Sequence, residues 1–213
     1  MMMQNIHKIL VIAPHTDDGE LGAGGSIAKF IESGAEVHYC AFSIAEEAIP
    51  SHLPKDILAS ESRQATKRLG ILPEHVTLNR FSVRRFREHR QDILDIMVKL
   101  SKQENFDLVM IPSLQDIHQD HQVVAEEAVR AFKKTSILSY ELPWNNLTFS
   151  HDCFVHLTES HLQKKIDALE AYSSQKERKY MAKDFIEGLA KIRGLQANNH
   201  LAEVFEVVRW IIK

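Results

Sequence analysis

The sequence predicts an α/β fold, a doubly wound and mostly parallel sheet with helices on both faces. Short apolar runs such as KILVIA (8–13) and DLVMIP (107–112) are typical of buried strands. They alternate with longer segments whose apolar residues recur at helical spacing, and this alternation is typical of βαβ units and therefore of a parallel sheet. Polar loops rich in histidine and aspartate follow the first and the fourth of these strands.

Each expected strand is a short run of apolar and β-branched residues. The expected strands cover residues 8–13, 36–43, 75–81, 107–112, 137–143, 153–158 and 202–211. Each expected helix carries apolar residues at intervals of three and four. The expected helices cover residues 24–33, 57–69, 89–105, 123–134, 161–175 and 176–194. Gly34 and Gly70 are expected to end the first two helices, and Pro50 and Pro54 mark residues 43–56 as a loop.

Composition limits the class of protein. The 213 residues carry 26 Lys and Arg against 29 Asp and Glu, and this balance argues against a nucleic-acid-binding protein, which normally presents a basic face. The length predicts a single domain over residues 1–213. Cys40 and Cys153 show no disulfide or paired metal spacing, so we expect reduced thiols. No apolar run approaches the roughly 18 residues of a membrane-spanning helix, so we expect a cytoplasmic protein without membrane insertion; whether it forms a homo-oligomer is left open.

The two polar loops are expected to face each other. The doubly wound strand order places the first and fourth strands side by side, and ligands bind at the carboxyl ends of such strands. The loop PHTDDGELGAGG after the first strand offers His15, Asp17 and Asp18. The loop SLQDIHQDHQ after the fourth strand offers Asp116, His118, Asp120 and His121. The sequence therefore predicts a cluster of imidazoles and carboxylates at one edge of the sheet.

This inventory of side chains suits a catalytic metal site. Zinc in such sites takes three nitrogen or oxygen ligands from the protein and keeps a position for water, whose pKa can fall to about 7. A carboxylate left over beside the metal can take the proton of that water. A histidine opposite can stabilise an oxyanion or protonate an amine, and an aspartate can orient a histidine.

Two other interpretations of the first loop were weighed. As a dinucleotide motif, GELGAGG is out of register with G-x-G-x-x-G, and Gly19 follows the strand too late. No acidic residue ends the second strand, and two carboxylates would repel a pyrophosphate. As a purely structural turn, Asp17 and Asp18 would be capping residues, which either loop alone permits. The pairing of the two loops favours the metal site.

The same residues resemble the PIG-L/LmbE family of zinc-dependent N-acetylglucosaminyl deacetylases. The likeness rests on PHTDDGELGAGGSIA and HQDH, and it extends over ESRQATKRLGI, ALEAYSSQ and IRGLQANNHLAEVFEVVR. The resemblance implies zinc ligands, a general base, a histidine that stabilises the oxyanion or protonates the amine, and an aspartate that orients a histidine. The implied zinc ligands are His15, Asp18 and His121, and the implied general base is Asp17. The implied oxyanion or amine histidine is His118, and the implied orienting aspartate is Asp120. The chain departs from the family pattern at Thr16, where the signature has proline, and at Tyr172, where some branches have histidine.

The resemblance implies hydrolysis of an acetamide on a small amino-sugar-type substrate, with release of acetate and a free amine. The cofactor it implies is Zn²⁺, and the same ligand types also accept Fe²⁺ or Co²⁺. Arg63 and the basic loop near Arg84 are further candidates for substrate contact on the ground of charge alone. The competing hypotheses are a metal-dependent amidohydrolase for a non-sugar amide, and a nucleotide- or metal-binding module without catalysis.

Overall fold

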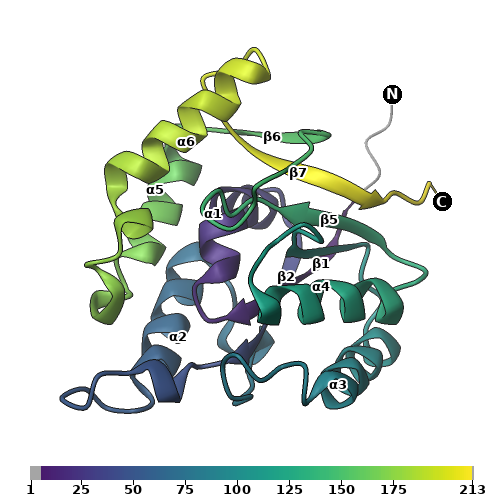
Figure 1. Ribbon diagram of the computed structural model, residues 1–213. Coiled ribbons are helices and arrows are strands. Elements are labelled where there is room, and N and C mark those ends of the chain that lie inside the picture. Colours follow the sequence, from purple (N-terminus) through teal and green to yellow (C-terminus); the bar gives the residue numbers. More distant parts are fainter. Residues whose placement is uncertain (1–5, 213) are drawn as a thin grey trace.

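A seven-stranded sheet with the strand order β3-β2-β1-β4-β5-β7-β6 forms the centre of the molecule (Figure 1). The computed structural model describes residues 6–212. The strands are β1 (Lys8–His15), β2 (Glu36–Ser43), β3 (Val76–Leu78), β4 (Leu108–Pro112), β5 (Ser136–Tyr140), β6 (Cys153–Leu157) and β7 (Leu201–Arg209). The first five strands pair in parallel, and β7 lies antiparallel between β5 and β6. The predicted mostly parallel sheet is confirmed, as is the adjacency of β1 and β4.

Helices cover both faces of the sheet, as expected. The helices are α1 (Asp18–Glu32), α2 (Ile57–Leu69), α3 (Arg90–Gln103), α4 (Gln119–Ala131), α5 (Glu159–Leu169) and α6 (Lys183–Gln196). Alternate residues of β1 belong to different hydrophobic clusters, because successive side chains of a strand point to opposite faces. Ile9 and Val11 pack with α1, α2, α5 and α6, whereas Leu10 and Ile12 pack with α3 and α4 (Figure 1).

Several expected boundaries are wrong, and two of the differences matter for the site. Helix α1 begins at Asp18 and helix α4 at Gln119, both earlier than their apolar periodicity indicated. The start of α4 is fixed by a side-chain cap, since the Nδ1 atom of His118 accepts a hydrogen bond from the amide of Asp120 at 3.2 Å. Asp18, Asp120 and His121 therefore lie on first helical turns and not on loops.

Two smaller differences concern weak patterns. The expected strand 75–81 shortens to β3, because only Val76–Leu78 pairs with β2. The expected helix 176–194 starts at Lys183, and a short 3-10 turn at Lys179–Met181 precedes it. Residues 176–182 therefore form an irregular segment between α5 and α6.

The glycines of α1 allow close packing and do not form a turn. All of them have ordinary helical φ angles, whereas Gly34 and Gly70, with φ of 89° and 98°, follow helices α1 and α2. A Cβ atom on Gly19 would lie 2.6 Å from the Tyr39 ring, and one on Gly22 would lie 2.2 Å from the Tyr140 ring. The glycine-rich motif therefore lets α1 lie against aromatic side chains of β2 and β5.

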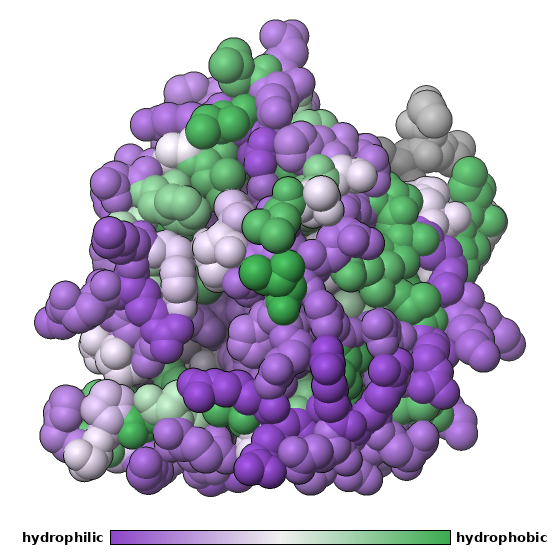
Figure 2. All heavy atoms as spheres, in the orientation of Figure 1, coloured by the Kyte–Doolittle hydropathy of each residue, from purple (hydrophilic) through white to green (hydrophobic). Residues whose placement is uncertain are grey.

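The face in Figure 2 is mostly hydrophilic, and hydrophobic side chains gather near the end of β7, where Val207, Trp210 and Ile212 are exposed. Cys40 and Cys153 are free thiols, as expected. Within residues 6–212, the helices are all too short or too polar to cross a membrane.

Replacing Gly22 with alanine should destabilise the fold. The added methyl would overlap the Tyr140 ring, and overpacking of this kind lowers the free energy of unfolding by about 1–3 kcal/mol. Gly188→Ala in α6 is the matched control, because its added Cβ has no neighbour within 4 Å. There, the higher helix propensity of alanine should raise stability by up to about 1 kcal/mol. Urea denaturation of both variants measures the difference; equal effects would contradict the packing role of Gly22.

Candidate functional site

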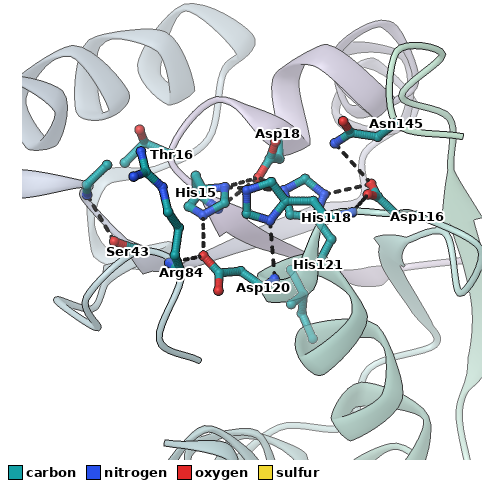
Figure 3. A network of polar contacts seen from close by, with 12 residues as sticks. His15, Thr16, Asp18, Ser43, Arg84, Asp116, His118, Asp120, His121 and Asn145 are labelled. Atoms are coloured by element: carbon teal, nitrogen blue, oxygen red, sulfur yellow. Dashed lines mark hydrogen bonds and ion pairs between the residues drawn. The ribbon is translucent and has the colours of Figure 1, made fainter. Parts of the chain in front are cut away.

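The pairing of β1 with β4 brings the two polar segments together. Residues Ile9 to Val11 pair in register with Leu108 to Met110, so the carboxyl ends of both strands lie at the same edge of the sheet. His15 ends β1, Asp18 begins α1, and His121 lies in the first turn of α4. Figure 3 shows these three side chains pointing toward one another.

Three ligand atoms from these residues form a nearly equilateral triangle. His15 Nδ1 lies 3.1 Å from Asp18 Oδ2 and 3.2 Å from His121 Nε2, and His121 Nε2 lies 3.3 Å from Asp18 Oδ2. Tetrahedral zinc with bonds of about 2.0–2.1 Å separates its ligand atoms by about 3.3 Å. The lone pairs of three acceptor atoms at this spacing repel one another unless a cation or protons lie between them. The residues present therefore fit a divalent metal ion.

Each imidazole of the triangle is held from behind by a buried carboxylate. His121 Nδ1 lies 2.7 Å from Asp116 Oδ2, and His15 Nε2 lies 3.2 Å from Asp120 Oδ2. Both carboxylates are almost completely inaccessible to solvent. Carboxylate–histidine pairs of this kind fix the ring orientation of metal ligands and increase their basicity. The imidazole that the Asp120 carboxylate contacts is that of His15.

The charges of the cluster shift the pKa values of its members. Burial alone would raise the pKa of Asp18, but the adjacent His121 and His15 hold it well below its ordinary range. Burial alone would lower the pKa of His121, but the Asp18 and Asp116 carboxylates raise it to about 10. The pKa of His15 is also raised, against burial, by Asp120 and Asp18. His121 therefore holds a proton at neutral pH when no metal is bound.

His118 differs from the other two histidines. Its backbone amide donates to Asp116 Oδ1 at 2.7 Å, and its Nδ1 accepts from the Asp120 amide. That acceptor role places the proton of the neutral ring on Nε2. Burial and the neighbouring His121 and His15 lower the pKa of His118 to about 4. His118 is therefore a neutral imidazole at pH 7, with an N–H to donate.

The Asp17 carboxylate has no partner of the kind that holds Asp116 and Asp120. In the described chain it forms no hydrogen bond or ion pair with another side chain, and it lines the same hollow as His118. Burial, and then the negative charge of Asp18, raise the pKa of Asp17 to about 6. A carboxylate with this pKa can take up and return a proton near neutral pH.

The backbone between His15 and Asp17 is held by two tyrosines, of which the sequence interpretation included Tyr172 and not Tyr39. Tyr39 donates to the carbonyl of Thr16 at 2.9 Å, and Tyr172 donates to the same oxygen. Both hydroxyls also contact the buried carboxyl of Glu20, whose pKa burial raises to about 8. The two departures from the family pattern, Thr16 and Tyr172, are therefore in direct contact with each other.

A cavity of about 300 Å³ opens beside the triangle. Besides the residues named above, its walls include side chains from helix α2 and from loops and short segments far apart in the sequence: Leu58, and Ala45, Ala48, Val83, Arg84, Trp144, Asn145, Gln175, Arg178 and Tyr180. Its size lies at the lower end of the range of small-molecule sites. Only Gln175, within the quoted segment ALEAYSSQ, and Arg84, in a basic cluster, carried any signal in the sequence.

Arg63 lies elsewhere. It is exposed on α2 and lines a separate hollow with Gln64, Thr66 and Lys67. A helix presents its residues on all sides, and the side of α2 that reaches the cavity carries Leu58. The arginines that line the cavity are Arg84 and Arg178.

A second group of potential ligands lies at the start of β2. Glu36, His38 and His75 each offer an atom within 4.8 Å of the others. The two imidazoles are stacked with centroids 4.1 Å apart, and the Lys8 ammonium already lies 3.0 Å from Glu36 Oε1. This group therefore has a cation of its own and provides a control for metal binding at the triangle.

Comparison with known families identifies the family of the chain. The model of the PIG-L family, described as GlcNAc-PI de-N-acetylase, matches residues 10–132, more than half of the chain. The chain belongs to the PIG-L family. The matched region contains every residue of the triangle and both supporting carboxylates.

Individual relatives are more distant. The chain is 27% identical over 173 residues to the uncharacterised deacetylase YaiS of Escherichia coli K12, which covers 78% of this chain and 90% of that protein. The N,N'-diacetylchitobiose deacetylase of Pyrococcus horikoshii is similar in structure, with a TM-score of 0.73 and 20% identity over 96% of this chain and 84% of that one. The 4-carboxy-2-hydroxymuconate hydratase GalB of Pseudomonas putida has a TM-score of 0.77 and 20% identity over 97% and 98% of the two chains. Because GalB is a hydratase, the fold alone does not determine the reaction.

Removing one corner of the triangle should abolish tight metal binding. We expect His121→Ala to lose one equivalent of bound Zn²⁺ per chain, because two ligands remain of the three that a catalytic zinc site requires. His75→Ala, in the second group of histidines, should keep that equivalent. Metal content is measured after dialysis, with circular dichroism as a check on folding. Loss of the same equivalent from His75→Ala would show that the metal binds at the second group, Glu36, His38 and His75, and not at the triangle.

Metal uptake should release protons. A metal ligand must be a neutral imidazole, whereas His121 is protonated below a pKa of about 10 when no metal is bound. At pH 7 we expect one to two protons to leave per Zn²⁺, and the apparent affinity to rise about tenfold per pH unit for each proton released. Titration calorimetry in two weakly coordinating buffers with different ionisation enthalpies counts them. Uptake without proton release would refute the protonation assigned to His121.

Proposed function

We propose that this chain is a metal-dependent N-deacetylase that hydrolyses the acetamide of an amino-sugar substrate to acetate and a free amine. The observation that carries the proposal is the position of Asp17 and His118. The first is a carboxylate without a side-chain partner and the second a neutral N–H donor, and both line the cavity beside a triangle suited to a metal.

His15, Asp18 and His121 would hold the metal, and we propose Zn²⁺ for its preference for tetrahedral nitrogen and oxygen ligands. When bound, the metal would act as a Lewis acid that polarises the acetamide carbonyl and acidifies a water molecule. Asp116 and Asp120 would keep the two imidazoles in their metal-binding orientation.

Asp17 would act as the general base. Its carboxylate takes a proton from the attacking water while the water oxygen bonds to the acetamide carbon. The negative charge then develops on the former carbonyl oxygen. His118 would donate its Nε2–H to that oxygen, because a neutral imidazole is a hydrogen-bond donor whose proton need not be transferred.

The second half of the reaction returns the proton. The carbon–nitrogen bond breaks, and the proton held by Asp17 passes to the leaving nitrogen, so that acetate and an amine are formed. The hydrogen bond that His118 Nδ1 accepts from the Asp120 amide places the proton of the neutral ring on Nε2, and this supports the oxyanion role over one in which His118 protonates the amine.

Substitution of the two side chains should separate their roles. We expect Asp17→Asn to lower kcat by about 10²–10⁴-fold, the usual contribution of general-base catalysis, with the bound metal retained. His118→Ala should lower kcat by about 10²–10³-fold, as for the loss of one oxyanion donor. Arg63→Gln, outside the cavity, is the control and should keep full activity.

Release of amine from N-acetylglucosamine and its conjugates by the zinc-loaded protein is the measurement. Non-sugar acetamides are assayed in parallel and would reveal a different amidohydrolase. Full activity of Asp17→Asn would exclude the proposed base, and a metal-loaded chain that cleaves no acetamide would exclude the function.

A further inference from the structure

The two arginines of the cavity form no ion pair with a carboxylate in the part of the chain that the structure describes. Within residues 6–212, neither Arg84 nor Arg178 takes part in a salt bridge, and the Arg84 guanidinium forms no hydrogen bond. Arg178 donates to the hydroxyl of Tyr180, and its positive charge acts to lower the pKa of Asp17 against burial and the charge of Asp18. The carboxylates that line the cavity are Asp17 and Asp18, which the proposed reaction occupies as base and metal ligand. Within residues 6–212, the lining of the cavity therefore holds two guanidinium groups that no carboxylate contacts at salt-bridge distance.

The backbone of Arg84 is held in a conformation that few side chains adopt. Its φ angle is 65°, in the left-handed region that disfavours residues with a Cβ atom. The Arg84 amide donates to Asp120 Oδ2 at 2.6 Å, and its carbonyl accepts from Gln119 Nε2 at 2.6 Å. Strained residues of this kind persist where the surrounding contacts fix them, and they concentrate at functional sites. In Figure 3 the Arg84 side chain extends from beside Asp120 toward Thr16, with its guanidinium free.

An aromatic surface adjoins Arg178. The rings of Trp144 and Tyr180 are stacked with centroids 4.3 Å apart, and both residues line the cavity. The Arg178 guanidinium lies 5.7 Å from the centroid of the Tyr180 ring. Aromatic side chains of this type offer an apolar face to a ligand and a polar tip at its edge. The cavity thus combines a triangle of ligand atoms suited to a metal, an aromatic wall and two guanidinium groups without an ion-pair partner among residues 6–212.

We propose that Arg84 and Arg178 form an anion subsite, and that the preferred substrate is an N-acetylated amino sugar that carries a phosphate or carboxylate substituent. This inference rests on the proposed deacetylase function and specifies its substrate class. Guanidinium groups bind phosphate and carboxylate through paired N–H donors, and such charge-assisted hydrogen bonds are the stronger ones in proteins.

Four probes distinguish an anionic from a neutral substrate. They are N-acetylglucosamine, its 1-phosphate, its 6-phosphate, and N-acetylmuramic acid as the carboxylate. With the zinc-loaded wild type, we expect kcat/KM for at least one anionic probe to exceed that of the neutral sugar by about 10- to 100-fold, the contribution of a hydrogen bond to a charged group. The advantage should shrink as ionic strength rises, because the subsite is open to solvent.

Variants assign the preference to the two arginines. Arg84→Gln and Arg178→Gln should raise KM for the preferred anionic probe about tenfold or more and leave the neutral sugar nearly unchanged. Arg85→Gln is the matched control, because Arg85 adjoins Arg84 in sequence but pairs with Glu88 outside the cavity. If Arg178→Gln slows the neutral sugar equally, Arg178 acts on Asp17 and not on an anion, and its part of the proposal is overturned.

Binding provides a readout independent of turnover. Calorimetry with zinc-loaded Asp17→Asn should show tighter binding of the anionic probe than of the neutral sugar, and Arg84→Gln in that background should remove the difference. Equal binding and equal turnover of all probes would overturn the anion subsite and leave the deacetylase function intact. If the anionic probe binds preferentially but the wild type turns over none of the probes, the anion subsite stands and the deacetylase function is overturned.

Discussion

The parallel pairing of β1 with β4 is the constraint on which the site depends. It places the end of β1, with His15, beside the end of β4, from which the chain passes through Asp116 into α4. Both following helices start almost at once, so Asp18 and His121 are carried on first helical turns. Three ligand atoms from segments about a hundred residues apart in the sequence then lie 3.1–3.3 Å from one another.

Electrostatics explain why such a cluster is tolerated in the interior. Asp18, Asp116, Asp120 and His121 are all buried, and unpaired buried charges would be strongly unfavourable. Each carboxylate here faces an imidazole or a backbone amide, so the charges are compensated pair by pair. Asp17 differs from these carboxylates, because in the described chain it forms no hydrogen bond or ion pair with another side chain. The network that stabilises the cluster thereby separates the residues that hold a metal from the residue that can exchange a proton.

The sequence predicted the sheet, the adjacency of the two strands and the residues that meet there, because hydrophobic periodicity and the topology of βαβ units are local or general rules. It could not show which histidine Asp120 contacts, since that depends on where α4 begins, and the cap that begins it involves an unusual acceptor, His118. It also named Arg63 for substrate contact by charge alone, but Arg63 lines a separate hollow. Which side of a helix faces a cavity depends on packing, which charge does not reveal. Trp144 and Tyr180 reach the cavity through irregular segments, for which periodicity carries no signal.

The floor and the rim of the cavity therefore differ in how they are built. The floor lies at strand ends and first helical turns, where sheet register, buried carboxylates and the contacts of Tyr39 and Tyr172 with Thr16 fix each side chain. The rim comes from loops and from the irregular segment after α5, which can change in sequence without disturbing the sheet. Metal binding and proton transfer should follow from the fold that the family shares. The choice of substrate should follow from rim residues such as Arg84 and Arg178, which is why the substrate is better inferred from this chain's own cavity than from its relatives.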